Sequence, residues 1–143
     1  MVIDTSALLA ILDDEPERRA FNEAIEGAEA RLMSVATFVE ASIVVEVRKG
    51  AEGLRDLDLF IDRGRIELVA VDAEQARVAR QAFSRFGKGR HPAGLNFGDC
   101  FPYALANVLG QQLLFKGQDF SRTDIVAYGP SPPPAVLDRS RGK

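Results

Sequence analysis

The sequence predicts an α/β fold in which helices cover both faces of a mainly parallel sheet of four or five strands. Short apolar runs alternate along the chain with longer segments whose apolar side chains recur at helical spacing. Gly27, Gly64 and Gly110 stand where helical segments should end. Because connections between parallel strands are right-handed, the carboxyl ends of the strands should meet along one edge of the sheet.

The N-terminal segment predicts one strand followed by two helices. Residues 2–4 form the expected strand, and an apolar helical pattern continues from there to about Leu12. A second helix should run to about Glu26, with Asp14 as its N-cap and Pro16 in its first turn.

A second strand is expected at residues 31–34, and the segment that follows, residues 35–48, allows two interpretations. It is rich in β-branched residues, which favours a strand. Its length and its lack of turn residues favour a buried helix, and we adopt the helix.

The middle of the chain predicts a helix, a strand and a second helix. Residues 54–61 mix leucines with charged residues as an amphipathic helix does, and residues 66–71 predict the third strand. Asp72 is expected to cap the next helix. The side chains that this helix should bury are Ala76, Ala79, Phe83 and Phe86.

The next part of the chain predicts a short helix and one or two strands. The helix is expected at residues 101–109, with Asn96 or Asp99 as its cap. Pro102 is compatible with it only because the first helical turn does not need the missing N–H. The strands are expected at residues 112–115 and, at an edge of the sheet, at residues 123–126.

Length and composition predict one folded domain followed by a tail. A chain of 143 residues suits a single domain with an adequate core. From Gly129 onward the sequence becomes rich in proline and then in charged residues. We therefore expect residues 1–128 to form the domain and residues 129–143 to form a flexible Pro-rich tail.

The composition excludes several classes of site. With one cysteine and one histidine, the chain has no disulfide framework, no thiolate or multi-histidine zinc site, and a poor basis for a Ser-His-Asp triad. Cys100 is expected in the core, and His91 on the surface. No apolar run is long enough to cross a bilayer and no signal peptide precedes the first strand, so we expect a cytoplasmic protein.

One stretch of the chain is locally basic although the net charge is −3. No acid occurs between Gln75 and Phe97. The cations of this stretch include Arg77, Arg80, Arg85, Lys88 and Arg90, with His91 beside them. The stretch is either a phosphate-binding surface or a plain solvated helix face and loop, and the composition alone leaves both open.

Four acids lie where a fold of this kind would bring them together. Asp4, Asp99 and Asp119 stand just after strands or at helix starts, and Glu40 is the only charge between residues 35 and 45. Several carboxylates in one cleft repel each other unless a cation neutralises them, and oxygen-only ligands favour Mg²⁺ or Mn²⁺. For single residues, simpler roles remain open: an N-cap for Asp4 and an arginine salt bridge for Glu40.

Thr5 and Ser6 follow Asp4 directly, and two roles are open for them. They could orient the Asp4 carboxylate or a bound water, or they could cap the first helix.

Three segments and one helix carry a resemblance to a known family. The segments are Val-Ile-Asp-Thr-Ser-Ala-Leu (2–8), Gly-Leu-Asn-Phe-Gly-Asp-Cys-Phe-Pro-Tyr-Ala-Leu-Ala (94–106) and Leu-Leu-Phe-Lys-Gly-Gln-Asp-Phe-Ser-Arg-Thr-Asp-Ile (113–125), and the helix is the one with Glu40. In this order they resemble the PIN-domain ribonucleases, and specifically the VapC toxins of bacterial toxin–antitoxin pairs. Pro102 departs from the small residue expected there.

The resemblance implies a three-layer PIN-like fold and an Mg²⁺-dependent endoribonuclease, with Mn²⁺ as a substitute. It places Asp4, Glu40, Asp99 and Asp119 at the catalytic positions, with Asp4 and Asp99 closest to the metal. Asp124 becomes a possible supporting acid. Candidate RNA-binding residues are Arg85, Lys88, Arg90 and His91. The resemblance further implies an RNA substrate, a homodimer, and a VapB-like antitoxin whose C-terminal segment blocks the site.

Two other functions fit the same fold class. A phosphate-accepting receiver domain also has an acid pocket and a lysine after a late strand, here Lys116, but it would need paired acids at the first strand. A catalytically idle member of the family would bind RNA or a partner without cleaving it, and the presence of all four acids argues against it.

Overall fold

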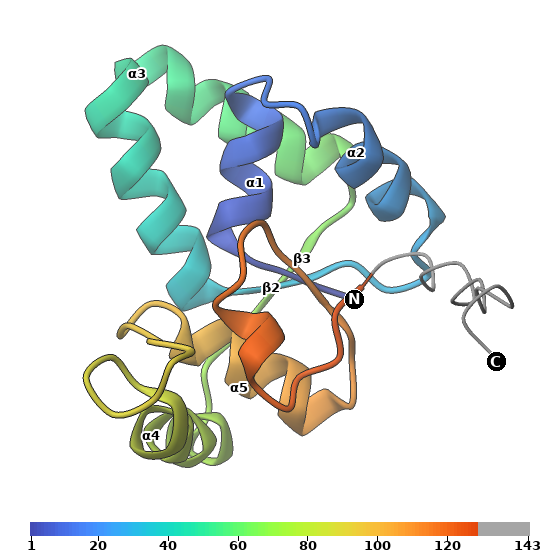
Figure 1. The fold of residues 1–143 in the computed structure, drawn as a ribbon. Helices are drawn as coiled ribbons and strands as arrows, with labels where there is room; N and C mark the ends of the chain where they lie inside the picture. The colour runs from blue at the N-terminus through green and yellow to red at the C-terminus, as the bar shows by residue number, and fades with distance from the viewer. Residues whose placement is uncertain (129–143) are drawn as a thin grey trace, which may run out of the picture.

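The fold is a four-stranded parallel sheet between two layers of helices, seen in a computed structural model that describes residues 1–128 (Figure 1). The strands are β1 (Val2–Ile3), β2 (Leu32–Ser34), β3 (Glu67–Val69) and β4 (Leu113–Leu114). Their order in the sheet is β3-β2-β1-β4, and every neighbouring pair is parallel. The predicted mainly parallel sheet is confirmed, with four strands. The predicted Pro-rich tail, residues 129–143, lies outside the described residues.

Five α-helices and one short 3₁₀-helix connect the strands. They are α1 (Thr5–Leu12), α2 (Arg18–Gly27), α3 (Val35–Arg63), α4 (Ala73–Phe86), α5 (Cys100–Leu109) and the 3₁₀-helix η1 (Phe120–Arg122). Helices α1, α2 and α3 lie on one side of the sheet, and α4 and α5 lie on the other (Figure 1). Within residues 1–128, no helix is both long and apolar enough to cross a membrane.

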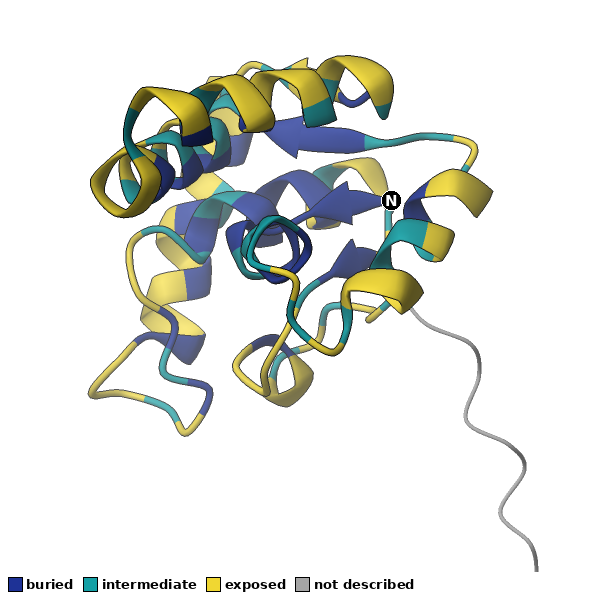
Figure 2. Ribbon diagram, turned by 90° about the horizontal axis from the view of Figure 1, so that it is seen from above, coloured by how far each residue is buried: buried dark blue, intermediate teal, exposed yellow. Residues whose placement is uncertain are grey.

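The side chains of β1, β2 and β4 alternate between two apolar clusters, as the pleat requires. Ile3 packs with α1 and α3, whereas its neighbour Val2 packs with α4 and α5. Leu114 and Leu113 divide in the same way at the end of β4. Both faces of the sheet are therefore covered, and β1, β2 and β4 are buried throughout (Figure 2), whereas the edge strand β3 is exposed or half-buried.

The segment with two interpretations is a helix. Ser34 caps α3, because its hydroxyl oxygen accepts a hydrogen bond from the backbone N–H of Ala36 at 3.2 Å. The β-branched residues at positions 35–48 do not prevent this, because one stripe of the helix packs on the sheet. Helix α3 includes the predicted helix at residues 54–61 and ends at Gly64 as expected, with a kink at Gly50 between its two halves.

Three local predictions differ from the structure. Helix α2 starts at Arg18 rather than beside Asp14, since Asp14 adopts a φ of 52° in the preceding turn and Glu17 takes the N-cap position. The predicted strand at residues 123–126 is reduced to an isolated bridge between Leu113 and Ala127, because the preceding 3₁₀ turn leaves little extended chain.

The buried face of α4 is rotated relative to the predicted one. Asp72 caps this helix as expected, but Ala76 and Phe83 are exposed, whereas Gln75 and Ala82 are buried. The two stripes share Ala79 and Phe86, so helical spacing alone does not distinguish them. The packing of α4 on α5 selects the stripe that contains Ala82.

We expect Gly50→Ala to lower the free energy of unfolding by about 1–3 kcal/mol. Gly50 has φ 65° and ψ −153°, a backbone region that only glycine adopts without strain, and a Cβ there would meet no atom within 4 Å. The cost would therefore come from the backbone alone. Urea unfolding measures it, with Gly27→Ala at the end of α2 as the control. Equal stability of the two variants would contradict this account of the kink.

Candidate active site

Asp4 follows β1 and is both the cap of α1 and a buried carboxylate at the carboxyl edge of the sheet. Its Oδ2 atom accepts hydrogen bonds from the Ser6 backbone N–H at 3.0 Å and from the Ser6 hydroxyl at 2.6 Å. The residue is only 5% exposed. The capping role and the site role are therefore compatible, because capping occupies one oxygen of the carboxylate.

Ser6 connects Asp4 to the neighbouring strand. Its hydroxyl donates to Asp4 and accepts a hydrogen bond from the backbone N–H of Lys116 at 2.9 Å, just after β4. The backbone N–H of Asp4 itself donates to the Leu114 carbonyl at 3.0 Å. The ends of β1 and β4 thus hold the carboxylate of Asp4 in one orientation, so the structure agrees with the orienting role for Ser6.

Glu40 reaches the same region from α3, and Thr5 holds it there. The Thr5 hydroxyl donates to Glu40 Oε1 at 2.6 Å. No ion pair within residues 1–128 involves Glu40, so the salt-bridge alternative does not describe this residue. The paired hydroxyls of Thr5 and Ser6 therefore each orient one acid of the site.

Asp99 is fixed by a reciprocal pair of hydrogen bonds with Asn96. The Asp99 backbone N–H donates to Asn96 Oδ1 at 2.9 Å, and the Asn96 backbone N–H donates to Asp99 Oδ2 at 3.0 Å. This is the pattern of a capping box at the start of α5. Asn96 is thus the residue that caps this turn, and Asp99 Oδ1 accepts no hydrogen bond within residues 1–128. Pro102 is buried as the third residue of α5, where its missing N–H breaks no helical bond.

Three of the acids lie within electrostatic reach of the fourth, Asp99. Burial, and then the negative charges of Asp4, Asp119 and Glu40, raise the pKa of Asp99 to about 6, although its hydrogen bond from Asn96 opposes the rise. Burial also raises the pKa of Asp4, with Glu40 adding to the effect and the bonds from Ser6 opposing it. Asp119 precedes η1 on the exposed rim of this region. Asp4, Glu40 and Asp119 therefore surround Asp99 closely enough to act on its charge, and the region of these four acids is called the acidic pocket.

The donor set of this acidic pocket fits a hard divalent cation. All candidate ligands are oxygens, and the raised pKa values of Asp4 and Asp99 reflect burial first and neighbouring negative charge second, both of which a bound cation would counter. Within residues 1–128 no three His, Cys, Asp or Glu side chains converge closely enough to form a metal cage. Mg²⁺ does not need one, because it usually takes one or two carboxylates and keeps several waters.

Asp124 and Arg85 bind each other beside α5. Asp124 accepts a hydrogen bond from the Tyr103 hydroxyl and forms an ion pair with Arg85 at 3.4 Å. Burial and the bond to Asp124 raise the pKa of Tyr103 to about 12, so the phenol remains a donor at neutral pH. Both oxygens of Asp124 are therefore engaged by Tyr103 and Arg85 rather than by the elements that carry the four acids.

The other cationic candidates lie in the loop after α4. Lys88 and Arg90 are exposed there, and Arg90 lies 5.8 Å from the ring centre of Phe83. His91 is partly buried: its Nδ1 accepts from the Ala93 backbone N–H at 3.0 Å and its ring packs edge-on against Phe86. Of these residues, Lys88 and Arg90 are the ones free to meet a phosphate backbone.

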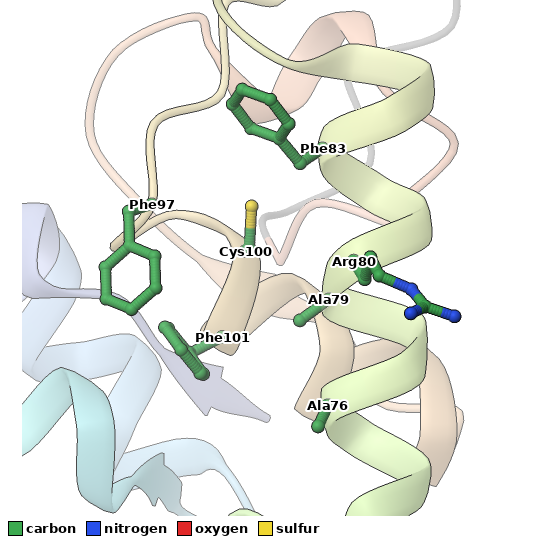
Figure 3. Close-up of a pocket in the computed structure, with 7 residues that line it drawn as sticks. All are labelled: Ala76, Ala79, Arg80, Phe83, Phe97, Cys100 and Phe101. Carbon is green, nitrogen blue, oxygen red and sulfur yellow. The ribbon is translucent and has the colours of Figure 1, made fainter.

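An apolar hollow lies beside the acids rather than over them. It has a volume of about 440 Å³ between α4 and the start of α5 (Figure 3). Its lining consists of Ala76, Ala79, Arg80, Phe83, Phe97, Cys100 and Phe101. Cys100 is buried, and burial followed by the charge of Asp99 raises the pKa of its thiol, so the expected core position is confirmed and the thiol is a poor nucleophile.

Two features of the site were not assigned from the sequence. Lys116 pairs with Glu15 and with Glu17, the latter at 3.3 Å, so it does not point its ammonium at the acids as a receiver lysine would. Gly98 lies directly against the carboxylate of Glu40. In the sequence, Gly98 is marked only by its position before Asp99 in Asn-Phe-Gly-Asp. The residue that makes a glycine necessary there is Glu40, which lies 58 positions earlier in the chain.

Comparison with known proteins gives one consistent result. The PIN domain family matches residues 1–126. Ribonuclease VapC30 of Mycobacterium tuberculosis is 56% identical over 125 residues, which cover 87% of this chain and 95% of that protein. The structure of M. tuberculosis VapC20, described as a sarcin-ricin loop cleaving toxin, has a TM-score of 0.73 at 17% identity and covers 90% of this chain and 98% of its own. A toxin–antitoxin complex from Klebsiella pneumoniae has a TM-score of 0.67 at 15% identity, with coverage of 89% and 95%.

We expect Asp99→Asn to stabilise the metal-free protein at about pH 7.5. The pKa of Asp99 is raised from 3.8 to about 6 by folding, so between these values the native state holds a proton that the unfolded chain has released. The free energy of unfolding therefore falls as the pH rises through this window, and it stays reduced above pH 6. The amide has no such dependence and still accepts the bond from Asn96.

The advantage of Asp99→Asn should shrink as the pH falls from about 6 to 4. Urea unfolding in the presence of a chelator measures it, and the exposed Asp58→Asn on α3 is the control. A stability difference that does not change with pH would show that the buried negative charge of Asp99 is not the cause.

Proposed function

Because the chain belongs to the PIN-domain family, in the group of the VapC ribonucleases, we propose that it is a metal-dependent endoribonuclease and the toxin of a type II toxin–antitoxin pair. The identity to curated VapC ribonucleases extends over nearly their whole length. The observation that carries the chemistry is the raised pKa of Asp99, which arises partly from the charges of Asp4, Glu40 and Asp119. A pocket with this excess of negative charge is suited to a cation.

Asp4 and Asp99 are the residues that would hold the metal, as Mg²⁺ with Mn²⁺ as a substitute. Each is fixed through one carboxylate oxygen, Asp4 by Ser6 and Asp99 by Asn96, which orients the other oxygen in advance. When bound, the cation would activate a water and stabilise the leaving oxygen of a phosphodiester. Glu40 and the exposed Asp119 would orient that water or accept its proton from the rim of the pocket.

The RNA backbone would be guided by the loop after α4. Lys88 and Arg90 are exposed and have no ion-pair partner within residues 1–128. Arg85 would bind RNA only while paired with Asp124. His91 contacts Ala93 and Phe86 and so supports the conformation of the loop. Lys88 and Arg90 therefore carry this proposal.

Partner and compartment follow from the family. A VapB-like antitoxin would bind the protein and place a basic side chain among the four acids, where unneutralised negative charge attracts it. The active form would be a homodimer. The protein would act in the cytoplasm, where RNA substrates are made.

We expect Asp4→Asn and Asp99→Asn to reduce RNA cleavage by more than about 100-fold. Mutation of residues that only hydrogen-bond to metal ligands already lowers metal affinity or activity by about 10–100-fold, and these two acids are proposed as ligands themselves. Both variants should remain folded. Glu40→Gln and Glu46→Gln form a matched pair on α3, of which only the first should lose activity, since Glu46 is exposed and outside the pocket.

Sequencing the 5′ ends of RNA fragments after expression of each variant measures this. Full cleavage by Asp4→Asn and Asp99→Asn would refute the mechanism. Absence of cleavage by the wild type, with RNA binding retained, would favour a catalytically idle binding protein.

We expect charge reversal at Lys88 and Arg90 to weaken RNA binding and to make its salt dependence less steep. Each phosphate contact to a single strand contributes about 0.7 to the slope of log K against log salt concentration, so two lost contacts should remove about 1.4. Filter binding across a salt series measures the slope. The control reverses Arg55 and Arg63, which are exposed on the second half of α3, and an equal effect there would exclude a specific role for the loop.

A further inference from the structure

Gly98 lies so close to Glu40 that no other residue would leave that carboxylate in place. A Cβ at position 98 would stand 1.7 Å from Glu40 Oε2, 2.7 Å from Cδ and 3.2 Å from Oε1. Contacts this short are far inside van der Waals distance. We propose that Gly98 is a positioning residue that determines where the Glu40 carboxylate lies in the acidic pocket, and this proposal rests on the proposed function.

The requirement is for space and not for backbone conformation. The glycines with positive φ within residues 1–128 are at positions 50, 89, 94, 110 and 117, and Gly98 is not among them. An alanine could adopt its backbone angles without strain. The three atoms nearest to the added methyl group all belong to the carboxylate end of Glu40, a flexible side chain.

Glu40 is held from two sides. The Thr5 hydroxyl bonds Oε1 at 2.6 Å, and the backbone of Gly98 adjoins Oε2. Thr5 belongs to the start of α1 and Gly98 to the turn before α5, so two separate elements fix a group carried by a third. A side chain at position 98 would push the carboxylate away and break its bond to Thr5.

The same turn also places Asp99. The reciprocal bonds between Asn96 and Asp99 close the turn in which Gly98 is the third of four residues. The turn therefore holds Asp99 and leaves space for the carboxylate of Glu40. The spacing between these two acids then depends on Gly98 having no side chain. Glu40 has a flexible end that can swing outward, so the cost of a methyl group should fall on cation binding rather than on folding.

The test is Mn²⁺ binding to full-length Gly98→Ala by calorimetry, together with thermal unfolding and RNA cleavage. We expect Mn²⁺ affinity to fall by about tenfold or more, as for the loss of a group that orients a metal site, with a melting temperature close to that of the wild type. Gly27→Ala is the control, since a Cβ at that position would meet nothing within 4 Å. Affinity equal to the wild type would overturn the proposal.

A double-mutant cycle with Glu40→Ala shows whether Gly98 acts through Glu40. The double variant Glu40→Ala/Gly98→Ala should bind Mn²⁺ as Glu40→Ala alone does, because the group that the methyl displaces is already gone. A further loss in the double variant would overturn the proposal.

Two other outcomes are distinct from these. If Gly98→Ala fails to fold, the double variant should fold as Glu40→Ala does, and its failure to fold would also overturn the proposal. A wild type that binds no Mn²⁺ would refute the proposed function, and the role of Gly98 with it.

Discussion

The burial of the Asp4 and Asp99 carboxylates beside other acids at one edge of the sheet is the constraint around which this structure is built. Burial and neighbouring negative charge raise the pKa values of Asp4 and Asp99, so bringing these acids together costs free energy that the rest of the fold must offset. Hydrogen bonds from Ser6, Thr5 and Asn96 offset part of it and at the same time fix the orientation of each acid. A bound cation of the proposed function would remove the remaining cost.

The parallel sheet makes this cluster possible. Because its strands run in one direction, the residues that follow β1 and β4 emerge side by side, and Ser6 bridges them through the Lys116 backbone. The two apolar clusters pack the strands from opposite faces, so the acids that follow β1 and β4 are attached to the buried core of the fold. The apolar hollow between α4 and α5 lies next to the acids, and Phe97 and Phe101 also line a second hollow that includes Glu40. Charged and apolar surfaces therefore meet at the turn of residues 96–99.

Local sequence signals predicted most of the elements, and the two main errors have different causes. The cap at Asp72 and the helix end at Gly64 depend on neighbouring residues and were correct. The buried stripe of α4 was displaced because Ala76 and Phe83 satisfy helical spacing as well as Gln75 and Ala82 do. The choice between such stripes is made by packing against α5, which is distant in sequence. The start of α2 was misplaced for a more local reason, since Asp14 adopts a positive φ that its sequence does not reveal.

The sequence by itself determined the chemistry: which side chains are acids, that oxygen is the only ligand type in quantity, and that the acids follow strands or precede helices. The tertiary structure alone decided how those acids are held. Glu40 accepts a hydrogen bond from Thr5 and has no arginine partner among residues 1–128. Asp124 contacts Arg85 and Tyr103. Gly98 leaves the space that the carboxylate of Glu40, from another helix, occupies. Composition and periodicity describe a residue and its neighbours along the chain, whereas a contact between α3 and the turn before α5 depends on the path of the whole backbone between them.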